Sequence, residues 1–89
     1  MYLIRCGDTS FYKIGISDSP MDRLCALQTS NPHLLSIELI SGFDTRRIAV
    51  ATEASAHAVL SEYNVRGEWF DLPLEIVAKV KRDMISLGS

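Results

Sequence analysis

Two short apolar runs near the start of the chain are separated by a stretch that suits a turn. Residues 2–6 (YLIRC) and 11–16 (FYKIGI) are rich in β-forming side chains, and residues 7–10 (GDTS) join them. Runs of this length joined by a short polar loop containing glycine are typical of an antiparallel β-hairpin. The rest of a short chain must then pack on the sheet that this hairpin begins.

The alternation of side chains along a strand assigns the polar residues of the hairpin to faces. Lys13 and Gly15 fall on one face of the second run, and Tyr12 falls on the other. We expect Lys13 to share a face with Tyr2, and we expect Tyr12 to enter the core.

Three further segments carry helix or strand signals. Ser19 and Pro20 suit the start of a helix that ends near Gln28 and buries Met21 with two leucines. Residues 34–43 (LLSIELISGF) form a strand pattern. Asp44 or Thr45 can then cap a helix over residues 46–63.

The end of the chain predicts a short extended segment and a last helix. Residues 64–67 (NVRG) indicate a break, and EWFDL follows as an extended stretch. Pro73 opens a helix whose apolar stripe includes Val80 and Ile85. The sequence therefore predicts an α+β fold, with a small three-stranded antiparallel sheet flanked by helices, in a single domain over residues 1–89.

Composition narrows the classes of protein to consider. A net charge of −2 argues against a general nucleic-acid coat protein, although it allows a few focused phosphate contacts. No apolar run approaches the roughly 20 residues of a membrane span, and the N-terminus lacks a signal-peptide pattern. We expect a cytoplasmic protein that does not enter a membrane. Cys6 and Cys25, with the histidines, have no spacing typical of a compact zinc module.

Glu53 and His57 are the first candidates for chemistry. Glu53 lies on the apolar stripe of the predicted helix 46–63, and burial of an unpaired carboxylate is costly. It should therefore meet a cation, either a metal ion or an arginine, which could be Arg23 or one of the Arg46-Arg47 pair. His57 follows one turn later on the same face, which permits a shared metal or phosphate site as well as an ordinary surface pair.

Three polar side chains could join Glu53 if the first helix packs beside the sheet face that carries Tyr2 and Lys13. Tyr2 could act as a base or orient a water, and Lys13 could assist. The planar guanidinium of Arg23 suits a phosphate. With Glu53 as ligand of a hard cation, this set could hydrolyse a phosphodiester.

The GEWF segment is the remaining conspicuous feature. Trp69 and Phe70 most often seal a core at such a position, although exposed aromatic side chains could stack on bases. Glu68 is either a second acidic residue of the site or a surface charge.

Taken in order, these pieces resemble the GIY-YIG nuclease superfamily, in particular its small branch common in phages and bacteria. The resemblance covers about residues 1–72. The residues that carry it are Tyr2-Leu3-Ile4, Tyr12-Lys13-Ile14-Gly15, Arg23, Glu53 with His57, and Gly67 to Phe70.

The resemblance implies a metal-dependent endonuclease that cuts DNA. Tyr2 and Lys13 would assist the nucleophile, Arg23 would hold the phosphate, and Glu53 would bind a single divalent cation, Mg²⁺ or Mn²⁺. Lys13 stands where the wider family has tyrosine.

The resemblance also suggests residues that bind the substrate. It implies that Gly15 leaves room for the substrate, and Asn64 is the candidate for the family's late asparagine. Glu68 is the third residue predicted to bind the substrate, and His57 joins Tyr2, Lys13, Arg23 and Glu53 among the predicted catalytic residues.

A second hypothesis is that the chain has the same fold but does not catalyse hydrolysis efficiently. In that case the chain is a module that binds nucleic acid, or a protein partner, or a second copy of itself. The acidic net charge and small size favour this alternative.

Overall fold

The predicted hairpin is present in the computed structural model, which describes residues 1–42 and 45–88. Strand β1 (Tyr2–Cys6) pairs with β2 (Phe11–Gly15) in antiparallel register. Tyr2 lies opposite Gly15, and Ile4 lies opposite Lys13. The hairpin therefore places Tyr2, Lys13 and Gly15 close together.

The sheet has five strands, so the expectation of three was wrong. Strand β3 (Leu35–Ile40) pairs with β1, and the short strands β4 (Asn64–Arg66) and β5 (Trp69–Asp71) extend the other edge. The order is β3-β1-β2-β5-β4, and all described pairs are antiparallel. Strands of three residues are too short to show alternation, which is why residues 64–67 suggested only a break.

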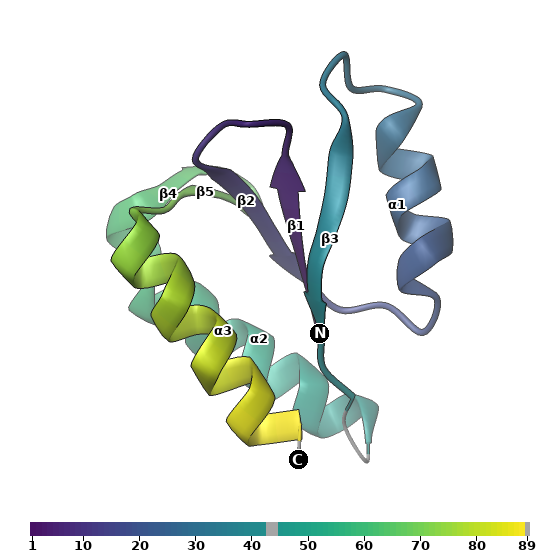
Figure 1. The fold of residues 1–89 in the computed structure, drawn as a ribbon. Coiled ribbons are helices and arrows are strands. Elements are labelled where there is room, and N and C mark those ends of the chain that lie inside the picture. Colours follow the sequence, from purple (N-terminus) through teal and green to yellow (C-terminus); the bar gives the residue numbers. More distant parts are fainter. Residues whose placement is uncertain (43–44, 89) are drawn as a thin grey trace.

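Helices cover both faces of the sheet (Figure 1). Helix α1 (Pro20–Gln28) lies on one face, and α2 (Arg46–Val59) and α3 (Leu74–Gly88) lie on the other. A short 3₁₀ helix, Ser61–Tyr63, follows α2. Each face has its own apolar cluster: Tyr2, Ile4 and half-buried leucines of α1 form one, and Tyr12, Phe70 and residues of α3 belong to the other.

Most predicted element boundaries agree with the structure, and two predicted core residues do not. Thr45 caps α2 by accepting a hydrogen bond from the Ile48 backbone N–H at 3.2 Å, whereas Asp44 lies outside the described residues. Met21 is 60% exposed and Ile85 is 59% exposed, while Met84 takes the buried position on α3. Both exposed residues lie on the solvent side of their helices. Over the described residues, no helix is long and apolar enough to cross a membrane.

Candidate functional site

Four of the predicted site residues line one open polar pocket. Tyr2 comes from β1, Arg23 from α1, Glu53 from α2, and Glu68 from the turn before β5. The pocket has a volume of about 580 Å³. We call it the polar pocket, and its lining consists of Tyr2, Ile16, Ser17, Asp18, Ser19, Arg23, Arg46, Glu53 and Glu68.

The side chains of Tyr2 and Glu68 both approach the backbone of Gly15 closely. A Cβ atom at this position would lie 2.5 Å from the Tyr2 hydroxyl oxygen and 2.7 Å from Oε2 of Glu68. Real Cβ atoms do not approach heavy atoms so closely. From the sequence, we expected the missing side chain of Gly15 to leave room for a substrate. In the structure, Tyr2 and Glu68 occupy the space next to Gly15.

The Tyr2 hydroxyl is poorly suited to lose its proton. Burial raises the pKa of this phenol above its usual value, and the negative charges of Glu68 and Glu53 act in the same direction. Hydrogen bonding and the positive charge of Arg23 partly oppose the rise in pKa. Tyr2 is therefore better suited to orient a water or a phosphate oxygen than to act as a base.

Lys13 lies behind the pocket rather than in its lining. Only 6% of the residue is exposed, and its Nζ atom is 3.9 Å from Oε2 of Glu68. Nζ also lies 5.7 Å from the ring centre of Trp69. Burial lowers the pKa of the Lys13 ammonium, and the Glu68 carboxylate opposes this change. The lowered pKa favours proton transfer at this side chain more than an exposed lysine would allow.

Glu53, His57 and Glu68 form a cluster of metal-ligand atoms at the edge of the polar pocket. One carboxylate oxygen from each glutamate and one ring nitrogen of His57 all lie within 4.8 Å of one another. Within the described residues, no ion pair of 4.0 Å or less involves Glu53, so the expected alternative of an arginine partner is not observed there. Arg46 instead pairs with Asp18 at 3.6 Å on the exposed rim.

Asn64 does not line the polar pocket. Its Nδ2 atom donates to the backbone oxygens of Gly67 at 2.8 Å and Trp69 at 3.1 Å. Asn64 therefore holds the β4–β5 turn in place. Its role in binding a substrate stays a prediction that its position does not support.

Among the aromatic residues of the GEWF segment, Phe70 is buried in the core and Trp69 is half-buried over Lys13. Cys6 and Cys25 are free thiols, the first buried and the second exposed.

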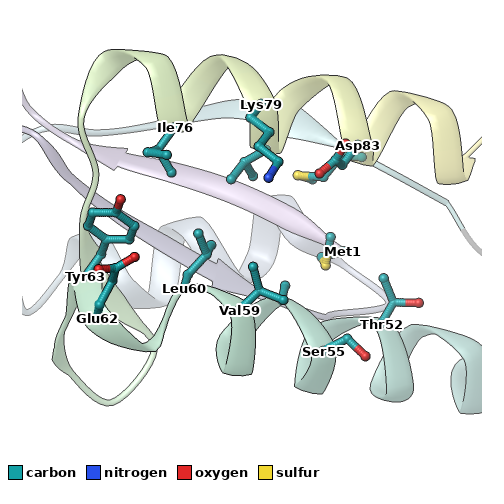
Figure 2. Close-up of a pocket in the computed structure, with 13 residues that line it drawn as sticks. Met1, Thr52, Ser55, Val59, Leu60, Glu62, Tyr63, Ile76, Lys79 and Asp83 are labelled. Carbon is teal, nitrogen blue, oxygen red and sulfur yellow. The ribbon is translucent and has the colours of Figure 1, made fainter.

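A second cavity lies on the face of the sheet that α2 and α3 cover, and none of the predicted site residues lines it. Figure 2 shows it between α2 and α3, with Met1 at one end and Tyr63 near the other. Its volume is about 310 Å³, and most of its lining is apolar, with charged groups such as Lys79 and Asp83 on α3. This arrangement offers no convergent set of catalytic groups, so the polar pocket is the candidate site.

The chain is thus a small α+β protein with one open polar pocket. The arginines of this pocket suit an anion, and its glutamates suit a cation. Comparison with protein families is more specific, because a family model for the T5orf172 domain matches residues 1–85 of the 89. The chain belongs to the T5orf172 domain family. No curated protein and no solved structure matches it. T5orf172 domains occur in some nucleases and DNA-binding proteins, which is consistent with nucleic-acid binding.

The family match corrects the assignment to the GIY-YIG nuclease superfamily. The T5orf172 domain is a different family, and its match covers nearly the whole chain. The motifs quoted above are short, and each is compatible with more than one family. The positions of the side chains in the polar pocket do not depend on that assignment.

Sequence reasoning missed several polar residues of the pocket. Ser17 and Ser19 lie in the turn between β2 and α1, and Arg46 begins α2. Arg46 was considered only as a partner for Glu53. The available signal was position, because residues in the turn after β2 must lie near Gly15, the last residue of that strand.

Proposed function

We propose that this chain is an endonuclease that hydrolyses DNA phosphodiester bonds with the help of a divalent cation. The observation that carries the proposal is the convergence of Arg23, Arg46 and Glu53 in one open pocket with the Tyr2 hydroxyl. Arginine side chains suit phosphate oxygens, and carboxylates suit divalent cations. Metal-assisted hydrolysis of a phosphodiester uses both kinds of group at one place.

The position and charge of each residue suggest its role in the reaction. Arg23 holds the scissile phosphate, and Arg46 on the rim lies where it can contact a neighbouring phosphate. Glu53 holds the cation, which when bound supplies stabilisation of negative charge on oxygen. Tyr2 keeps its proton and orients the attacking water, because its pKa is raised.

Lys13 acts from behind the pocket in this proposal. Its buried ammonium, close to Glu68, contributes positive charge near the phosphate in its protonated form. In its neutral form, which the lowered pKa favours, it can accept a proton through a water.

A plasmid-nicking assay tests the proposal. We expect the purified protein to nick supercoiled DNA with Mg²⁺ or Mn²⁺ and to lose this activity in EDTA. Glu53→Gln and Arg23→Ala should each lower the rate by about a hundredfold or more, as for loss of a group that stabilises charge in the transition state. Glu62→Gln and Arg47→Ala are matched controls, because both residues are exposed and neither lines the polar pocket. Equal activity in wild type and Glu53→Gln would indicate a contaminating nuclease and would refute the proposal.

The second candidate function is DNA binding without cleavage. The acidic net charge and the raised pKa of Tyr2 favour it, since both weaken an efficient hydrolytic site. Fluorescence anisotropy with a labelled DNA duplex at low salt distinguishes the two. Binding that weakens with salt and with Arg23→Ala, in the absence of any nicking, would identify a binding module.

A further inference from the structure

We propose that Glu53, His57 and Glu68 form a three-ligand site for a divalent transition-metal ion of the Mn²⁺, Co²⁺ and Zn²⁺ class. This inference deepens the proposed function, on which it rests for the use of the ion, because it assigns the cation a full set of protein ligands. Binding of the ion itself does not require DNA. It can therefore be tested separately.

The fold brings the three ligands together from two elements. Glu53 and His57 are four residues apart on α2, so their side chains leave the same face of the helix. Glu68 follows Gly67, whose positive φ of 54° forms the tight turn before β5. The ligand atoms lie within 4.8 Å of one another. Two ligands on one ion are separated by at most about 4.4 Å, or twice a bond of about 2.2 Å, so small side-chain movements close the site.

The backbone of Ile14 positions two of the three ligands. Its N–H donates to the Glu68 backbone oxygen at 3.2 Å, and its carbonyl oxygen lies 2.9 Å from Nε2 of His57. One residue of the central hairpin thus fixes Glu68 relative to His57. Contact between the His57 ring and Phe70, with ring centres 5.0 Å apart, further limits the orientation of the imidazole.

The same hydrogen bond fixes the tautomer of neutral His57. A carbonyl oxygen can only accept, so Nε2 must carry the proton and donate it to Ile14. Nδ1 is then the nitrogen with a free lone pair, which is the form that binds a metal. Histidine ligands of metals usually donate their other N–H to a carbonyl or carboxylate in this way.

The donor set selects the class of ion. An imidazole nitrogen suits Zn²⁺ and other transition ions, whereas Mg²⁺ prefers oxygen ligands and keeps several waters. Sites with three protein ligands leave a position open for water or substrate. Because Glu53 and Glu68 both line the polar pocket, that open position faces the place where we put the phosphate.

The chain offers an internal control for the test, since its two histidines are His33 and His57. His33 is exposed and lies outside the cluster. We would titrate the ¹⁵N-labelled protein with Zn²⁺ alone and follow both imidazoles by NMR. The expected result is a large shift of Nδ1 of His57 at one equivalent of Zn²⁺, with His33 unchanged. Shifts of His33 at the same or lower Zn²⁺ concentration would overturn the proposal.

Calorimetry with variants tests the carboxylate ligands. Glu68→Gln keeps the shape of the side chain and should weaken Zn²⁺ binding at least tenfold, while the exposed control Glu62→Gln should bind as wild type does. Binding by Glu68→Gln within twofold of wild type would overturn the three-ligand site. If Glu68→Gln altered the amide spectrum, the wild-type histidine titration alone would decide. Nicking supported by Mg²⁺ without any Zn²⁺ binding would leave the proposed function standing and reject only this inference.

Discussion

Gly15 is the residue on which the geometry of the site depends most directly. The strand pairing places it opposite Tyr2, and the phenol lies over it in the space that a side chain would fill. Glu68 approaches the same point from the neighbouring turn. The carboxylate is the end of a flexible chain and can move, whereas the ring of Tyr2 is 1% exposed and packed against its neighbours, so its displacement is costly.

Gly15→Ala should therefore destabilise the protein and disturb the site together. We expect a loss of about 1–3 kcal/mol in the free energy of unfolding, as for other insertions into well-packed regions. Displacement of Tyr2 and Glu68 should also weaken Zn²⁺ binding. Urea unfolding followed by circular dichroism measures the first effect, and calorimetry measures the second.

Gly42→Ala is the matched control for this substitution. A Cβ atom at Gly42 meets no other atom within 4 Å, so this variant should unfold as the wild type does. Equal stability of the Gly15 and Gly42 variants would contradict the close packing described here.

At the scale of elements, the β4–β5 hairpin places one ligand of the candidate metal site. It consists of two three-residue strands joined by a turn. The Asn64 side chain donates hydrogen bonds to the backbone oxygens of Gly67 in the turn and of Trp69 in β5. A hairpin this short contributes little apolar contact of its own, because β4 is exposed along its length. Side-chain hydrogen bonds thus account for much of its order.

Asn64→Ala should loosen this hairpin while the rest of the fold persists. Loss of two hydrogen bonds predicts a destabilisation of about 1–2 kcal/mol, and a less fixed Glu68 should weaken Zn²⁺ binding severalfold. Hydrogen exchange of the Trp69 and Phe70 amides measures the local effect. Asn31→Ala, at the other asparagine, removes a bond in the turn before β3 and should leave Zn²⁺ binding unchanged. If both variants bound Zn²⁺ equally well, Asn64 would have no role in placing Glu68.

The elements also show which parts of the structure the sequence could predict. Long segments with clear periodicity, such as the first hairpin and α2, follow from the residues themselves, and so does the shared face of Tyr2 and Lys13. The extended stretch EWFDL predicted β5, but the three-residue strand β4 leaves little trace in the side-chain pattern, and the pairing of both strands with the sheet does not follow from the sequence. The contact between His57 and Ile14 joins residues 43 positions apart, and only the folded chain specifies it.

At the scale of the molecule, the polar pocket combines residues that are far apart in the sequence, from β1, α1, α2 and two turns. Tyr2 lies in the first strand, and Glu68 lies six elements later, in the turn between β4 and β5. Among the three described α-helices, α3 contributes none of the lining of the polar pocket, and it packs on the opposite face of the sheet from α1 (Figure 1). Its contribution to function is therefore expected to be stability alone.

Met84→Ala tests this separation between stability and chemistry. Met84 is 1% exposed in the apolar cluster beneath α3, so its truncation should cost about 2–4 kcal/mol. For a chain of this size, that loss lowers the melting temperature by about 10–30 °C. Because α3 does not line the polar pocket, Zn²⁺ affinity and nicking rate per folded molecule should match wild type well below the new melting temperature. Ile85→Ala, at an exposed neighbour on the same helix, should change the melting temperature little. Loss of Zn²⁺ binding by fully folded Met84→Ala would show that α3 also shapes the site.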